Sequence, residues 1–146
     1  MNFTLRPAKI EDSPAIYDLI IEGHINPTGL DWRRFILAVT PEGEAIGCGQ
    51  IKPHRDGSQE LASIAVTPAW QGKGVARAII EHLIDGVDSP LYLMCVSTMG
   101  PMYEKFGFRG LNEDEMPKYF RRVSKLAGFI EPLRKEGQTL LGMGRE

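Results

Sequence analysis

A glycine-containing segment between a strand-like run and a helical pattern has the residue types needed to bind a phosphate. It follows the apolar run Leu61 to Val66 and the turn residue Pro68. Its residues are Gln71, Gly72, Lys73, Gly74, Val75 and Ala76. Glycines allow a sharp turn there, and a helix N-terminus offers unpaired N–H groups and roughly half a positive charge. The spacing therefore favours an anion site to which Lys73 could add a cation, with a purely structural strand–turn–helix as the alternative.

Two common phosphate-binding motifs do not fit this segment. The loop of ATPases requires G-x-x-x-x-G-K-[ST], which is not present here, and the dinucleotide motif requires a third glycine where Arg77 stands. The chemistry of the segment must therefore be read from a different pattern.

Two short motifs resemble those of the GNAT acyltransferase superfamily. Gln71-x-x-Gly74-x-Ala76 is similar to its [RQ]-x-x-G-x-[GA] signature. The segment from Tyr103 to Phe108 reads YEKFGF and is similar to a second family block, which follows about thirty residues later. The resemblance covers residues 3–108. It implies that the glycine loop holds the pyrophosphate of coenzyme A and that the chain transfers an acetyl group from acetyl-CoA to a primary amine of a small molecule or peptide by direct attack.

The resemblance also implies which residues perform this reaction. Glu60, at the start of the strand before the loop, is the candidate base, and Tyr103 is the candidate acid beside the cofactor sulfur. Backbone groups of Ile64, Ala65 and Val66 would polarise the thioester carbonyl and pair with pantetheine. Ser97 occupies the region where many members carry a cofactor-contacting asparagine, so we expect it to contact the cofactor.

Each of these roles has a structural alternative. Glu60 could be a charged residue at a strand entrance, and Tyr103 a core tyrosine whose hydroxyl reaches the surface. His54 has a suitable unperturbed pKa of about 6.5 for acid–base work, but a single histidine in a turn is expected to be solvated. No residue is assigned to a metal.

The apolar periodicity predicts an α/β (α+β) fold around these residues. Strands are predicted over residues 3–6, 35–40, 45–52, 60–66, 91–96 and 139–143, with another beginning at Phe108. Helices are predicted from Ser13, from Val75 to Asp85, from Met102 to Phe106 and from Phe120 to Ile130. The order is that of a GNAT-like mixed, mostly antiparallel sheet flanked by helices, with a helical insertion before the last strand.

Composition restricts the class of protein. The 146 residues are expected to form a single acyltransferase domain over 1–146, and the net charge of −2 argues against a nucleic-acid partner. The sequence shows neither a membrane-spanning run nor a signal-peptide core, which favours a cytoplasmic protein with no membrane partner. Cys48 and Cys95 are interpreted as small buried hydrophobic residues. The resemblance allows a homodimer.

Two alternative functions stay open. The first is a CoA-binding sensor or partner module without catalysis, because the family's asparagine is missing. The second is an amino-acid N-acetyltransferase resembling N-acetylglutamate synthase, suggested by Asp114-Glu115-Met116-Pro117 and by Arg33 or Arg34 as a carboxylate ligand. The sequence does not distinguish among amine acceptors and does not give the oligomeric state.

Overall fold

The computed structural model describes residues 2–130 and 139–146, which form two compact units. Within these ranges, one unit comprises residues 2–52 and 61–87, and the other comprises residues 53–60, 88–130 and 139–146. The strands follow the order β1-β2-β3-β4-β5-β7-β6 in a mixed sheet. Strand β4 pairs in parallel with β5 at Glu60 and Tyr92, whereas the β1–β2, β2–β3, β5–β7 and β6–β7 pairings are antiparallel. This confirms the predicted fold class.

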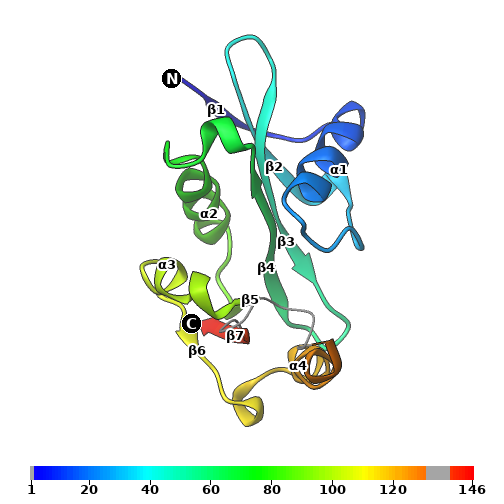
Figure 1. Ribbon diagram of the computed structural model, residues 1–146, viewed down its shortest axis with the longest axis vertical. Helices are drawn as coiled ribbons and strands as arrows, with labels where there is room; N and C mark the ends of the chain where they lie inside the picture. Colours follow the sequence, from blue (N-terminus) through cyan, green and yellow to red (C-terminus); the bar gives the residue numbers. More distant parts are fainter. Residues whose placement is uncertain (1, 131–138) are drawn as a thin grey trace. The chain divides into compact units, whose positions relative to one another are not determined.

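The first unit is a sheet with one helix on each face (Figure 1). Its strands are β1 (Thr4–Pro7), β2 (Phe35–Val39), β3 (Ala45–Pro53) and the greater part of β4 (Gln59–Val66). Helix α1 (Ser13–Glu22) contributes Ile16, Leu19 and Ile20 to the core on one face. Helix α2 (Val75–Asp85) covers the other face, so β2 is buried on both sides.

Two glycines on β3 allow α2 to lie close to the sheet. A Cβ on Gly47 would come within 2.8 Å of Val75 Cγ1, and one on Gly49 within 2.7 Å of Ile79 Cγ2. The helix fits because neither position carries a side chain. This packing fixes the N-terminus of α2, where the glycine loop ends.

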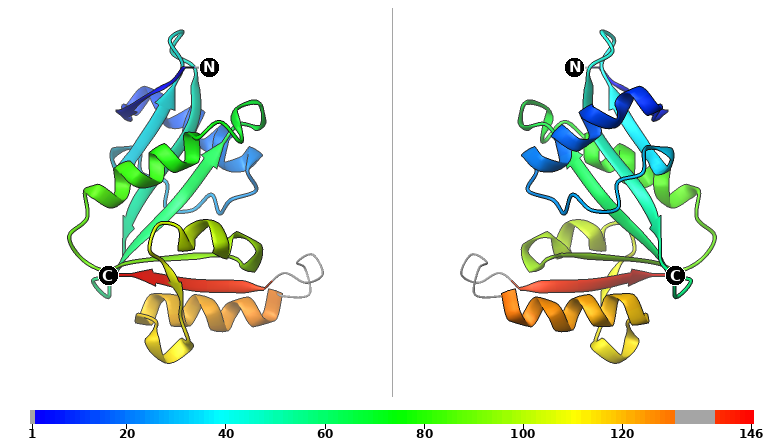
Figure 2. Two further views of the ribbon diagram at one scale, coloured as in Figure 1. Left: turned by 90° about the vertical axis from the view of Figure 1, so that its left-hand side faces the viewer. Right: turned by 90° about the vertical axis from the view of Figure 1, so that its right-hand side faces the viewer.

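In the second unit, β5 (Leu91–Val96) and β7 (Leu140–Arg145) pair along their whole length. Figure 2 shows α3 (Gly100–Glu104) on one side of these strands and α4 (Lys118–Ile130) on the other. Strand β6 (Arg109–Gly110) pairs with β7 over two residues. Helix α4 is the predicted insertion before the last strand. Helix α3 starts two residues earlier than expected, with Pro101 in its first turn, where a missing N–H costs nothing.

No helix within the described ranges is both long and apolar enough to cross a membrane.

Candidate functional site

The glycine loop has the backbone conformation that an anion site needs. Gly72 and Gly74 have φ angles of +76° and +85°, in the left-handed region that side chains disfavour. Gly74 is the residue before α2, and no side chain caps that helix terminus. The first N–H groups of α2 are therefore left for a bound group or water, and a helix N-terminus favours an anion.

The shape of the loop comes from φ and from one side-chain hydrogen bond. A Cβ on Gly72 or Gly74 would meet no atom within 4 Å, so glycine is required there for its conformation and not for space. The Gln71 side-chain amide donates to the Val66 carbonyl over 3.2 Å and ties the loop to the end of β4. Lys73 is exposed. The loop residues and Ile64 to Val66 all belong to the first unit.

Strand β4 contains a conformational irregularity that sequence reasoning missed. Ser63, directly before Ile64, has a φ of +60°, which is uncommon for a residue other than glycine, asparagine or aspartate. The fully buried Gln50 holds it: its amide nitrogen donates to Ser63 Oγ over 2.8 Å and to the Gly29 carbonyl over 3.3 Å. Strained backbone of this kind is common at functional sites. Nothing local in the sequence marks Ser63, because serine has no particular preference for this conformation.

The candidate base Glu60 is paired with a histidine. His54 Nε2 lies 2.8 Å from Glu60 Oε1, and the two side chains are only 9% and 13% exposed. Tyr119 stacks on the His54 ring with centroids 3.5 Å apart, and the buried Phe120 meets that ring edge-on. The expectation that His54 is a solvated turn residue was wrong. The turn places it across from Glu60, within hydrogen-bonding distance of the carboxylate.

Asp56 holds the turn between His54 and Glu60 against α4. Its carboxylate accepts hydrogen bonds from the Ser58 N–H and from the Tyr119 N–H, each over 2.9 Å. Burial opposes ionisation, but these bonds, with the Ser58 hydroxyl and the charge of His54, lower the pKa of Asp56 to about 2. The inserted helix is therefore tied to the segment that carries the candidate base.

Tyr103 lies on α3 and is partly buried. Burial raises the pKa of its hydroxyl to about 12, with a smaller contribution from Cys95. Its ring packs edge-on against Phe108, which is itself buried. Among residues 2–130 and 139–146, no hydrogen bond to the Tyr103 hydroxyl is found.

Ser97 and the two cysteines have structural roles. The Ser97 N–H donates to the Thr139 carbonyl over 2.7 Å, and Ser97 Oγ accepts from the Thr139 N–H over 3.2 Å. The Ser97 O–H can still donate to a ligand. Cys48 is buried and Cys95 partly buried, and burial raises the pKa of their thiols to about 12 and about 11. Neither has the low pKa of a nucleophilic thiol.

The arginines proposed as carboxylate ligands already have partners. Arg33 Nε lies 3.0 Å from Asp31, and Arg34 is within 3.9 Å of the same carboxylate. An incoming carboxylate would have to compete with Asp31, which makes these arginines less suitable as its ligands.

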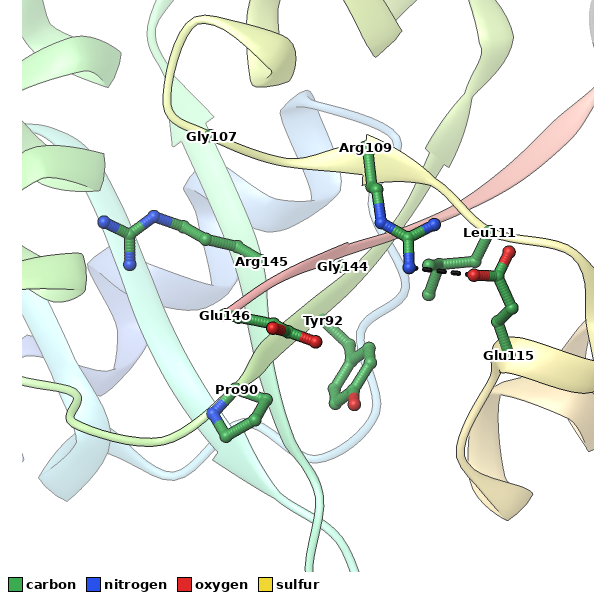
Figure 3. Close-up of a pocket in the computed structure, with 9 residues that line it drawn as sticks. All are labelled: Pro90, Tyr92, Gly107, Arg109, Leu111, Glu115, Gly144, Arg145 and Glu146. Atoms are coloured by element: carbon green, nitrogen blue, oxygen red, sulfur yellow. Dashed lines mark ion pairs between the residues drawn. The ribbon is translucent and has the colours of Figure 1, made fainter.

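Described residues of the second unit line more than one cavity. One, of about 540 Å³, lies at the end of β7 and is shown in Figure 3. Its Arg109 pairs with Glu115 over 2.8 Å, and Arg145 donates to the Phe106 carbonyl. Another, of about 500 Å³, lies between the turn after β3 and the start of α4. It is lined by His54, Arg55, Asp56, Lys118, Tyr119 and Arg122.

Comparison with known proteins gives a family match and structural neighbours. The model of the acetyltransferase (GNAT) domain family matches residues 31–110. An amino-acid acetyltransferase of Neisseria meningitidis serogroup B is 30% identical over 86 residues, which are 56% of this chain and 20% of that protein. This chain thus spans about a fifth of the length of that curated relative.

Two solved structures share the fold at low sequence identity. N-acetylglutamate synthase from Neisseria gonorrhoeae, complexed with coenzyme A and N-acetyl-glutamate, gives a TM-score of 0.75 at 22% identity, over 99% of this chain and 35% of that one. Rv2747 from Mycobacterium tuberculosis, in complex with CoA, gives a TM-score of 0.73 at 21% identity, over 97% and 98%. At this identity the likeness concerns the fold.

Proposed function

Because this chain belongs to the GNAT acetyltransferase family, we propose that it transfers the acetyl group of acetyl-CoA to a primary amine. The observation that carries the proposal is the uncapped N-terminus of α2, preceded by two left-handed glycines. Such a terminus binds anions, and the pyrophosphate of coenzyme A is the anion that the family resemblance implies.

The residues of the first unit fit the cofactor. The N–H groups at the start of α2 would hold the pyrophosphate, with the exposed Lys73 as an additional cation. Backbone groups of Ile64 to Val66 would pair with the pantetheine arm. The left-handed Ser63, held by Gln50, would set the direction of these groups.

Glu60 and His54 would accept the proton of the acceptor amine. The Glu60 carboxylate can take that proton while its hydrogen bond to His54 Nε2 keeps it oriented. The amine nitrogen then forms a bond to the acetyl carbon, and the bond from that carbon to sulfur breaks, which releases the thiolate.

Tyr103 would stabilise the thiolate as it leaves. With a pKa of about 12, its hydroxyl stays protonated at every physiological pH, as a donor must. It acts chiefly by donating a hydrogen bond to the developing negative charge. The thiolate finally takes up a proton through water, which balances the proton that Glu60 accepted from the amine. Ser97, which retains its own O–H, would contact the cofactor beside it.

An amino acid is the acceptor favoured by a specific observation. The curated relative that is 30% identical over 86 residues is an amino-acid acetyltransferase, and the N-acetylglutamate synthase structure shares the fold. A peptide or another small amine is the alternative.

A thiol-release assay with acetyl-CoA over a broad amine panel tests the function. Glu60→Gln should lower kcat by about 10²–10⁴-fold, the usual contribution of a positioned base. The control Glu42→Gln changes an exposed turn glutamate and should leave kcat unchanged. Tyr103→Phe should lower kcat more than it weakens acetyl-CoA binding, whereas Tyr17→Phe, on the exposed face of α1, should do neither.

Two results would contradict the proposal. If acetyl-CoA does not raise the melting temperature of the protein, it does not bind the native state, because a ligand of the native state must stabilise that state. Binding without turnover of any amine would instead indicate a CoA-binding module without catalysis.

A further inference from the structure

The cavity between the β3–β4 turn and α4 combines two segments that lie far apart in the sequence. His54, Arg55 and Asp56 come from the turn, and Lys118, Tyr119 and Arg122 come from the first turns of α4. The stacked rings of His54 and Tyr119 form part of its wall, and the Asp56 bond to the Tyr119 N–H holds the two segments together. At about 500 Å³, the cavity is large enough for a small metabolite.

Three exposed cations line this cavity, Arg55, Lys118 and Arg122. Within residues 2–130 and 139–146, Arg55, Lys118 and Arg122 make no ion pair and no side-chain hydrogen bond. Arg33 and Arg109, by contrast, each pair with a carboxylate within 3.0 Å. Lys118 and Arg122 are also four residues apart on α4, where like charges destabilise a helix by a few tenths of a kcal/mol. An anion between them would remove this repulsion.

Asp56, the carboxylate among the described lining residues, offsets only part of this positive charge. Asp56 directs one oxygen to Ser58 and the other to the Tyr119 N–H, so its hydrogen bonds are used within the turn and the helix start. The Glu60 carboxylate is directed to His54. The cavity therefore presents an excess of positive charge to any molecule that enters it.

We propose that this cavity binds an anionic group of the acetyl acceptor, a carboxylate or a phosphate, and so restricts the enzyme to amines that carry one. The inference rests on the proposed function. His54 lines the cavity and is hydrogen-bonded to Glu60, so an anion held by Arg55, Lys118 and Arg122 keeps the amine of the same small molecule near the proposed base. Guanidinium groups suit this purpose because they bind carboxylates and phosphates through two parallel hydrogen bonds.

The test compares each acceptor with its uncharged counterpart. The probes are the L-amino acids and their α-amides, with the diamides of aspartate and glutamate. O-phospho-L-serine amide is compared with serine amide, and phosphoethanolamine with ethanolamine. The wild-type enzyme should show kcat/KM at least about tenfold higher for the anionic member of the best pair. Which pair responds, carboxylate or phosphate, identifies the anion.

Substitutions on α4 test whether Lys118 and Arg122 cause the preference for anionic acceptors. Arg122→Gln and Lys118→Gln should each lower kcat/KM for the anionic acceptor about 10- to 100-fold and leave its uncharged counterpart within about twofold. Lys125→Gln is the matched control, because it removes an exposed cation from the same helix outside the cavity lining. Equal wild-type rates for both members of every pair, or an unchanged preference in Arg122→Gln, would overturn the inference.

Failure of the proposed function would be distinguishable from failure of this inference. If no amine is acetylated, the anion site can still be tested by titration calorimetry. The experiment measures the binding of L-glutamate and of O-phospho-L-serine in the presence of coenzyme A. Saturable binding that is lost in the double variant R55Q/R122Q would support an anion site without acetyl transfer. No saturable binding of either probe by the wild-type protein would overturn it.

Discussion

Substitutions of Gly74 can distinguish two effects. A side chain at this position strains the left-handed backbone, and a negatively charged side chain also repels a bound phosphate. Gly74 has a φ of +85°, and a Cβ there would meet no atom within 4 Å. Gly43, in the β2–β3 turn, has a φ of +88° and the same open surroundings. The two sites therefore have matched conformational strain and matched space, and only one belongs to the candidate phosphate site.

Alanine at either position should cost the same stability. A left-handed residue with a side chain costs about 1–2 kcal/mol. For a chain of 146 residues this corresponds to a fall in Tm of about 3–8 °C. Thermal melts of Gly74→Ala and Gly43→Ala without ligand should show similar losses, which sets the baseline for the charged variants.

Glutamate adds a charge, and its effect should be confined to position 74. A carboxylate about 5 Å from a phosphate charge is repelled by about 0.8 kcal/mol in bulk water and about 3 kcal/mol at an effective dielectric constant of 20. The Kd for acetyl-CoA should therefore be about 4- to 250-fold weaker in Gly74→Glu than in Gly74→Ala. Gly43→Glu should bind like Gly43→Ala.

Titration calorimetry at low and high salt completes this experiment. Screening should reduce the penalty in Gly74→Glu as ionic strength rises. An acetyl-CoA affinity that is the same in Gly74→Glu and Gly74→Ala would refute the assignment of this loop to the pyrophosphate, whatever the stabilities of the variants.

Three further predictions concern stability and reactivity. Because the pKa of Asp56 is lowered to about 2, its ionised form stabilises the fold above pH 4, and this contribution is lost as the pH falls through 2. Urea denaturation should show Asp56→Ala less stable than wild type by about 1 kcal/mol at pH 7, a value reduced for the exposure of this side chain, and no less stable near pH 1. Gly49→Ala should cost about 1–3 kcal/mol in the same assay by overpacking against Ile79, whereas Gly86→Ala, with ordinary surroundings and a φ of −86°, should cost less than 1 kcal/mol. Cys48, with a thiol pKa raised to about 12 by burial, should resist alkylation at pH 8 until the protein is unfolded, and rapid reaction of the native protein would contradict this.

Short-range sequence patterns predicted the helices and strands of this protein. The apolar positions Val75, Ile79, Ile80 and Leu83 recur at helical spacing, and all four are buried in α2. The continuous apolar run of β5 and the turn signals around β2 and β3 correctly predicted those strands. These features depend on periodicity and turn chemistry, which act over a few residues and can be read from them. The loop motif belongs to the same class, since its glycines have the positive φ angles that a sharp turn before a helix needs.

Only the tertiary structure decided what surrounds the candidate base. Glu60 could be identified by its position on a strand, but its pairing with His54 depends on how the intervening turn folds. The stacking of Tyr119 on His54 joins residues that lie 65 positions apart in the chain. Likewise, the left-handed conformation of Ser63 is held by the buried Gln50, which no local preference specifies.

The sequence by itself therefore determined the order of strands and helices and the segment suited to a phosphate, because backbone propensity and apolar spacing are local. The cationic cavity was decided by the packing of α4 against the β3–β4 turn, which brings Arg55 to the same cavity as Lys118 and Arg122. Contacts of this kind bring together charges that are separate in the sequence, and their proximity is a property of the folded chain.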